Sequence, residues 1–192
     1  MAINTAAINN PQIISDAARM FGSSTITVSI EAIRQADGRY LAYTDNGREY
    51  TGVDAFEWAI RAAELGAGEI LLTSVDREGT GLGYDIELTQ KIANSLPIPV
   101  IASGGVGQIS HLSQVILEAN ADAVSLASLL HYDFIKNHRV EGDFSQGGNV
   151  EYLKTNKTFS KINPAGLAEI KNYLLEQGIN CRNTCKKPAL NV

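Results

Sequence analysis

The strongest constraint on the fold is a strand–loop–helix pattern that repeats along the chain. Residues 69–85 read EILLTSVDREGTGLGYD, an apolar run that ends in a polar, glycine-rich segment, and an amphipathic helical pattern starts at Ile86. The same order recurs where apolar residues 99–102 precede SGGVG at 103–107. Strands that alternate with helices require right-handed crossovers, so the pattern predicts an α/β fold with a parallel sheet.

Hydrophobic periodicity and turn residues predict most of the remaining elements. We expect helices at 9–21, 55–65, 86–95, 110–119 and 165–177, strands at 25–31, 70–75, 98–102 and 121–126, a β-ribbon over 36–50, a strand stub at 2–3, and loops at 4–6 and 127–128. The last three strands are nearly all apolar, which predicts that both faces of the sheet are buried. Asp54 is expected to cap the helix at 55–65 and Trp58 to pack in the core. The inner face of that helix is expected to hold Phe56, Ala59, Ile60 and Ala63.

A doubly wound sheet and a (β/α)-barrel both satisfy this pattern, and periodicity alone does not choose between them. A complete barrel needs eight strands and about 200–250 residues, whereas four strands and a stub are visible in 192 residues. An incomplete barrel would leave open edges that favour self-association. We expect residues 1–192 to form a single partial domain, with an irregular insert at about 132–163 that is rich in Asn, Lys, Gly and Ser.

The composition argues against several classes of protein. The net charge of −5 and the scattered Lys and Arg residues make a nucleic-acid partner a poor expectation. Since there is neither an apolar run of membrane-spanning length nor a signal-peptide layout, we expect a cytoplasmic protein. Cys181 and Cys185 are expected to be reduced surface thiols, and neither a metal site nor a cofactor is predicted.

Three loop starts carry small residues with free backbone amides. They are Gly79, Ser103-Gly104-Gly105, and Ala127-Ser128, each directly after a predicted strand or its polar loop. Amides that converge at strand ends and helix N-termini bind phosphate, and glycine lets the anion approach the backbone. A single SGG is equally consistent with a tight turn, but three such loops in consecutive βα units favour a phosphate site.

Several polar side chains stand at the same strand ends. Glu31 closes one predicted strand, and Asp76 and Glu78 lie in the polar loop, where carboxylates can serve as general acids or bases or can simply be solvated. Thr73 can bind a substrate or its own loop. Glu69 stands at the opposite, amino-terminal end of its strand, where a solvent-facing carboxylate is the commoner arrangement.

Four segments together resemble a known family. NTAA at 4–7, GAGEILLTSVDREGTGLGYD at 66–85, IASGGVG at 101–107 and SLASLLH at 125–131 are similar to the cyclase subunit of imidazole glycerol phosphate synthase, a histidine-biosynthesis enzyme. The resemblance runs from about residue 4 to 131 and resumes at 164–182. It implies a TIM barrel and a lyase reaction in which ammonia from a glutaminase partner cleaves a phosphoribulosyl substrate. The products would be imidazole glycerol phosphate and an aminoimidazole carboxamide ribonucleotide.

The resemblance also implies roles for individual residues. One substrate phosphate would bind at Gly79, Gly105, Ala127 and Ser128, and the other at Asn4 and Thr5. The resemblance also places Thr73 and Ser103 in the pocket lining and Glu69 at the gate through which ammonia enters the barrel. Asp76 and Glu78 are expected to line the same pocket because of their position in the polar loop.

The chain departs from the family pattern at three places. The family has a catalytic Asp on its first strand and another on its fifth. The first three strands have no counterpart here, and Glu31 stands where the fifth-strand Asp belongs. Misplacing a carboxylate by an ångström can cost about 100-fold in rate. The loop acid is Glu78 instead of Asp, and the 132–163 insert is atypical.

We therefore expect the carboxyl-terminal part, about the last four βα units, of an eight-fold barrel that is inactive as an isolated chain. Two alternatives stay open: a divergent paralogue in surface-sugar amidation, and a non-catalytic, phosphate-binding half-barrel that forms homodimers through its open edges.

Overall fold

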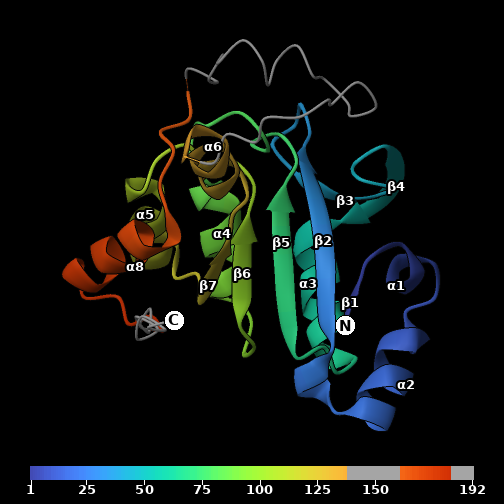
Figure 1. Ribbon diagram of the computed structural model, residues 1–192. Coiled ribbons are helices and arrows are strands. Elements are labelled where there is room, and N and C mark those ends of the chain that lie inside the picture. Colours follow the sequence, from blue (N-terminus) through green and yellow to red (C-terminus); the bar gives the residue numbers. More distant parts are fainter. Residues whose placement is uncertain (138–160, 183–192) are drawn as a thin grey trace, which may run out of the picture.

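The computed structural model describes residues 1–137 and 161–182, and its centre is one sheet of seven strands (Figure 1). The strands are β1 (Ala2–Ile3), β2 (Thr27–Arg34), β3 (Tyr40–Thr44), β4 (Glu49–Asp54), β5 (Glu69–Ser74), β6 (Val100–Ser103) and β7 (Ala123–Ser125). Their order is β4-β3-β2-β5-β6-β7; β1 pairs with the first residues of β2, and β3 with its last. The pairs β1–β2, β2–β5, β5–β6 and β6–β7 are parallel, which confirms the predicted parallel sheet.

The helices are α1 (Thr5–Asn9), α2 (Gln12–Phe21), α3 (Ala55–Glu64), α4 (Ile86–Ala93), α5 (Ser110–Ala119), α6 (Ser128–Asn137) and α8 (Leu167–Glu176), with a 3₁₀ helix, η1, at Ser23–Thr25. The predicted helices at 55–65, 86–95, 110–119 and 165–177 are therefore confirmed. Asp54 caps α3 as predicted, because its carboxylate accepts hydrogen bonds from the amides of Phe56 and Glu57 at 2.9 and 3.1 Å.

The amino-terminal region differs from the prediction. Residues 4–6 were expected to be a loop, but Thr5 begins α1. The helix expected at 9–21 is present as α2 and starts at Gln12, after a break at Asn10, so that Asn9 belongs to α1. Asn10 has φ −143° and ψ 87° and precedes Pro11, whose ring disfavours a helical conformation in the residue before it. The proline therefore separates α1 from α2 and sets the start of the predicted helix.

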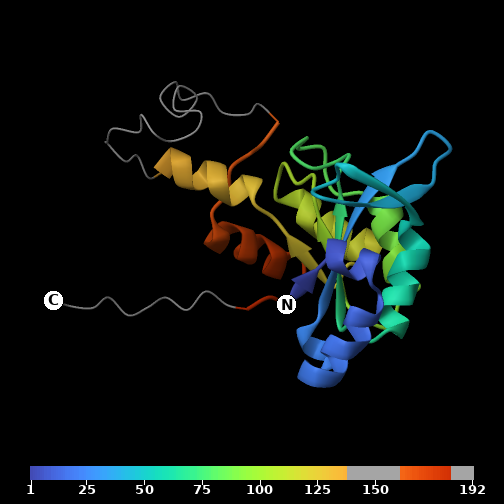
Figure 2. The same ribbon diagram turned by 90° about the vertical axis from the view of Figure 1, so that its right-hand side faces the viewer.

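Helices cover one face of the sheet, and the opposite face is only partly buried. Figure 2 shows α3 and α4 together on one side of the strands. Alternate side chains of β2, β5 and β6 pack against that layer and are fully buried: Val28, Ile30, Ala32, Ile70, Leu72, Val100 and Ala102. The other alternate set, which includes Ser29, Leu71 and Ile101, is half-buried. The expectation that both faces are buried is therefore wrong, since nothing in the described residues covers the second face completely.

The inner face of α3 is rotated by about one residue from the prediction. Ala55, Trp58, Ala59 and Ala62 are buried, whereas Phe56, Ile60 and Ala63 are only half-buried. Ala59 is the one residue that both sets share. Trp58 was expected to pack in the core, and its 5% exposure confirms this. Periodicity predicted the helix correctly, but contact with the sheet decides which of its side chains are buried.

The carboxyl-terminal part also differs from the prediction. Residues 127–128 were expected to begin a loop, but Ser128 begins α6, which includes residues 132–137 of the expected insert. Residues 138–160 of that insert lie outside the described residues. β7 has only three residues, and Ala123 and Ser125 are exposed. Within the described residues β7 pairs only with β6 and β4 only with β3, so the sheet is open.

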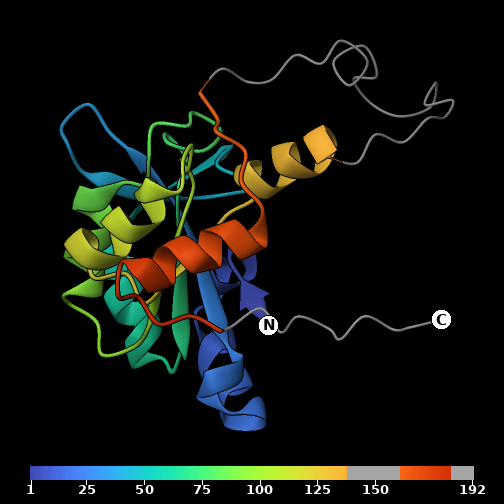
Figure 3. The ribbon, with the colours of Figure 1, turned by 60° about the vertical axis from the view of Figure 1, so that its left-hand side comes forward.

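The helix α8 packs against α5 at the β7 side of the sheet (Figure 3). Ile170 and Leu174 of α8 share a core cluster with Leu112 and Val115 of α5. The hydroxyl groups of Ser113 and Tyr173 lie 2.9 Å apart, in a hydrogen bond between the two helices. The second core cluster therefore joins α8 to the βα units that precede residue 138.

Candidate functional site

One row of polar side chains crosses the uncovered face of the sheet near the carboxyl ends of the strands. Glu31 of β2 pairs with Thr73 of β5, Thr73 pairs with Ser103 of β6, and Ser103 pairs with Ser125 of β7. Because residues in register on parallel strands point to the same face, these four side chains lie side by side. Three of them were predicted site residues. Ser125 was not, although it opens the segment SLASLLH that supported the family resemblance.

The carboxylate of Glu31 is held by the turn between β3 and β4. The backbone amide of Gly47 donates a hydrogen bond of 2.8 Å to Glu31 Oε2. Among the described residues no partner is recorded for Oε1. Glu31 is half-buried on the uncovered face, so one carboxylate oxygen remains available to a ligand.

The other two predicted acids lie in the loop after β5. Asp76 accepts a hydrogen bond of 2.7 Å from the backbone amide of Arg34 and thereby ties this loop to the end of β2. Glu78 is exposed, and within the described part of the chain its carboxylate has no recorded hydrogen bond or ion pair. Asp76 therefore makes a structural contact with β2, whereas Glu78 lies in solvent.

The predicted phosphate loops leave the sheet at one rim. Gly79, Gly105 and Ala127-Ser128 follow the adjacent parallel strands β5, β6 and β7, and these loops lie at the upper end of the strands in Figure 1. Gly83 donates a hydrogen bond of 2.8 Å to the carbonyl of Gly105, and the Tyr84 hydroxyl donates one of 3.0 Å to the carbonyl of Ser125. The loop before α4 therefore connects the ends of β6 and β7.

The glycines of these loops serve different purposes. Gly105 has φ 106°, and a Cβ on it would overlap the carbonyl oxygen of Gly83 and lie 2.9 Å from Arg77 Cβ. Its missing side chain is thus needed for packing between two loops, whereas the sequence reasoning assigned it to anion approach. Gly79 has φ 71°, and its Cβ position has no atom within 4 Å, so the space beside Gly79 is open.

The third loop ends in the first turn of α6. A helix N-terminus leaves backbone amides without partners inside the helix, and its dipole attracts an anion. Ala127 precedes Ser128, and the Ala127 carbonyl accepts the hydrogen bond of His131 N in the first turn. This geometry presents the Ser128 end of α6 toward the same rim as Gly79.

Asn4 and Thr5 lie on the other side of the row, next to β2. Asn4 follows β1, and its side-chain amide donates a hydrogen bond of 3.3 Å to the carbonyl of Tyr43 in β3. Asn4 Oδ1 is buried and has no partner within the described residues. Thr5 is exposed at the start of α1. The two predicted phosphate positions are therefore separated by the width of several strands.

Glu69 lies at the opposite end of the strands. The Thr27 hydroxyl donates a hydrogen bond of 2.6 Å to Glu69 Oε1, and the two residues are paired across β2 and β5. Glu69 is half-buried, so it is not the solvent-facing carboxylate that is commonest at a strand start. Thr27 was not predicted, because no local pattern indicates a partner 42 positions away.

A separate cavity of about 350 Å³ lies between β3, the loop before α4, and α5. Arg34, Tyr40, Arg77 and Asp85 are among the residues that line it, and none of the predicted site residues does. Burial raises the pKa of Tyr40 to about 12, and the neighbouring Asp85 adds to this shift. The Tyr40 hydroxyl donates to Asp85 Oδ2 at 3.0 Å, so this buried pair supports the loop and does not face the row.

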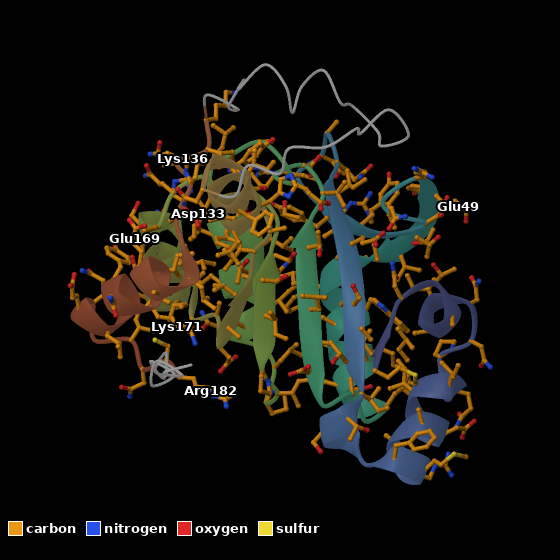
Figure 4. All side chains as sticks on the ribbon, viewed as in Figure 1. Glu49, Asp133, Lys136, Glu169, Lys171 and Arg182 are labelled. Carbon is orange, nitrogen blue, oxygen red and sulfur yellow. The ribbon has the colours of Figure 1, made fainter. Side chains whose placement is uncertain are left out.

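Charged side chains flank the strands on both sides. In Figure 4, Asp133 and Lys136 of α6 and Glu169 and Lys171 of α8 lie at the β7 side, and Glu49 lies at the hairpin side. In residues 1–137 and 161–182, no group of three or more His, Cys, Asp or Glu side chains could hold a metal ion. No helix in the same residues is long and apolar enough to cross a membrane.

Comparison with known proteins agrees with the resemblance drawn from the sequence. A family model described as histidine biosynthesis protein matches residues 1–136. The chain belongs to this family. It is 48% identical over 141 residues to the imidazole glycerol phosphate synthase subunit HisF of Alkaliphilus metalliredigens (strain QYMF). The match covers 73% of this chain and 56% of that relative, so the chain spans little more than half of the relative's length.

Proposed function

We propose that this chain is the carboxyl-terminal part of a cyclase-type lyase of the imidazole glycerol phosphate synthase kind, with one phosphate site and one acid–base carboxylate. The observation that carries the proposal is the position of Glu31, Thr73 and Ser103 in one row across adjacent strands, whose following loops carry Gly79, Gly105 and Ala127-Ser128. The 48% identity to a HisF subunit favours this chemistry over other phosphate-binding α/β folds.

The proposed fold is an incomplete (β/α)-barrel, in which residues 1–192 form a single partial domain. Two features support it. The uncovered face carries half-buried polar residues where a closed barrel would have its interior, and the relative is longer than this chain. The missing strands would cover this face and complete the ring.

In this proposal the amides at Gly79, Gly105, Ala127 and Ser128 bind one substrate phosphate, and Asn4 and Thr5 bind the other. Two such groups on different strands would suit a substrate with a phosphate at each end. Glu31, through Oε1, would transfer the proton that ring closure requires. Thr73, Ser103, Asp76 and Glu78 would line the pocket, of which Thr73 and Ser103 lie in the Glu31 row.

Glu69 is proposed as a gate for ammonia at the far end of the strands. Its bond to Thr27 holds the carboxylate at the amino-terminal end of the sheet, away from the Glu31 row. A glutaminase of the amidotransferase type would dock at this end and deliver ammonia. As an isolated chain the protein is expected to be inactive, since residues on the missing strands would complete the catalytic site.

Two measurements test the proposal. Inorganic phosphate at millimolar concentration should raise the melting temperature, because a ligand that binds only the folded state stabilises it. Absence of any shift would contradict the phosphate site. Ordinary turnover of the phosphoribulosyl substrate with ammonium by the purified chain would contradict the view that half of the catalytic site is missing.

A second candidate is a phosphate-binding half-barrel without catalytic function that forms homodimers. The open edges at β4 and β7 and the exposed residues of β7 favour it. Sedimentation would separate the candidates, because a well-folded monomer that binds phosphate excludes the dimer. A paralogue in surface-sugar amidation would share the phosphate site. A comparison of the melting temperature with phosphorylated sugars and with the imidazole precursor would identify it, because the paralogue should be stabilised more by a sugar.

A further inference from the structure

The turn between β3 and β4 lies against the proposed catalytic carboxylate. Gly47 N donates its hydrogen bond to Glu31 Oε2 at 2.8 Å. On its other side, a Cβ on Gly47 would be 2.9 Å from Val75 Cγ1 and 3.3 Å from Val75 Cγ2. Val75 directly follows β5, and its amide donates to the carbonyl of Ala32 in β2 at 3.0 Å. The turn therefore contacts the ends of two neighbouring strands at the rim.

This turn has an unfavourable backbone conformation. Asp45, Asn46 and Gly47 are consecutive and have φ values of 51°, 57° and 76°. The left-handed region costs about 1–2 kcal/mol for a residue with a Cβ, although Asp and Asn tolerate it better than most. The ion pair of Arg48 with Asp45 spans 3.8 Å, and both side chains are largely exposed, so it contributes little. Arg48 N donates hydrogen bonds to the carbonyls of Thr44 and Asp45 at 3.1 and 3.3 Å and closes the turn. The part-buried hydrogen bond from Gly47 to Glu31 then ties the turn to β2.

The length of the Glu31 side chain matters for this contact. Glu31 is paired with Tyr43 in β3, and its carboxylate reaches past that pair to the amide of Gly47. An Asp on the same backbone would end about 1.5 Å earlier, the length of one carbon–carbon bond. The hydrogen bond from the Gly47 amide fixes the position of Oε2. It therefore also fixes where the free Oε1 lies on the uncovered face.

We infer that the Gly47 amide is a positioning group for Glu31, and that the β3–β4 turn sets the direction of the free carboxylate oxygen. The hairpin is thereby a part of the site. The side chain of Glu31 has one methylene more than Asp, and this methylene lets its carboxylate reach the Gly47 amide. This inference rests on the proposed acid–base role of Glu31. It makes Gly47 a positioning residue and not a catalytic one, because Gly47 acts only through Glu31.

The test is proton NMR of the full chain, with the Gly47 amide as the probe. Hydrogen exchange at Gly47 should become about ten- to a hundred-fold faster in Glu31→Ala, the range expected for the loss of one charge-assisted hydrogen bond. Glu31→Gln keeps an acceptor oxygen at the same distance and should retain most of the protection. Glu31→Asp should lose the protection.

Two glycines of the same hairpin provide a matched control. Gly47 and Gly52 have φ values of 76° and 75°, but a Cβ on Gly52 would meet only the Tyr50 ring at 3.6 Å. Gly52→Ala should leave the contact between Gly47 and Glu31 intact, and Gly47→Ala should abolish it. Gly47→Ala combined with Val75→Ala removes both short contacts and should restore the nuclear Overhauser effect between residue 47 and Glu31.

Each outcome decides the inference. Equal protection of Gly47 in the unchanged protein and in Glu31→Ala, or full protection in Glu31→Asp, would overturn it. Absence of stabilisation by phosphate, together with Gly47 protection that still depends on Glu31, would instead contradict the phosphate site and support the positioning contact. The two failures are therefore distinguishable.

Discussion

The packing of the loops after β5 and β6 is tested most sharply by substituting Gly105 with Ala. At φ 106° an L-residue is strained, which costs about 1–3 kcal/mol. The new Cβ would overlap the Gly83 carbonyl and lie 2.9 Å from Arg77 Cβ, and neither of these atoms can rotate away. The resulting shift would also break the 2.8 Å hydrogen bond from Gly83 to Gly105, worth about 1 kcal/mol. The expected loss in the free energy of unfolding is therefore about 3 kcal/mol or more.

Gly79→Ala is the matched control for Gly105→Ala. Gly79 also has a positive φ, 71°, but its Cβ position is open. Only the backbone term of about 1 kcal/mol should remain. Thermal unfolding should show a fall of about 2–4 °C for Gly79→Ala and about three times that for Gly105→Ala. Equal shifts for the two variants would refute the reasoning from loop packing, and a phosphate response that survives in Gly79→Ala would weaken the assignment of Gly79 to the anion.

Three further predictions concern single side chains. Thr27→Val keeps the shape of the side chain but leaves the half-buried Glu69 without its 2.6 Å donor. Urea unfolding should therefore show a loss of about 1–2 kcal/mol in the free energy of unfolding. That loss should disappear when Glu69→Gln is added. Burial lowers the pKa of His111, whose Nδ1 accepts the amide of Gly107 at 3.1 Å, so the folded state binds fewer protons than the unfolded state. Stability should then fall as the pH drops below about 6.5, and His111→Gln should remove that dependence in a pH series of melting temperatures. Asp54→Ala removes two hydrogen bonds at the start of α3 and should cost about 1 kcal/mol, while Asp54→Ser restores most of it.

Local patterns predicted the elements that depend on local interactions. The cap at Asp54, the helix at 110–119 and the parallel strands followed from side chains close in sequence. The glycine loops were also correctly expected at neighbouring strand ends, because the direction of parallel strands follows from the alternation with helices. An error arose at residues 4–6, which were expected to be a loop but include the start of α1 at Thr5.

Contacts between residues far apart in the chain could not be predicted from the sequence. The inner face of α3 and the open second face of the sheet depend on which elements are present to cover them, which no local periodicity records. The bonds of Thr27 to Glu69 and of Gly47 to Glu31 join positions 42 and 16 residues apart. The direction of a side chain at a strand end is set by the segment that packs on it, and this is known only once the chain is folded.

The sequence by itself therefore determined the kind of fold, the strand ends that carry polar groups, and the family. Only the tertiary structure decided that Glu31, Thr73, Ser103 and Ser125 share one row. It also decided that Gly105 is required by a neighbouring carbonyl, and that a hairpin turn holds Glu31. The physical reason is that propensity and periodicity act over a few residues, whereas register and loop packing are set by strands and loops brought together from across the chain.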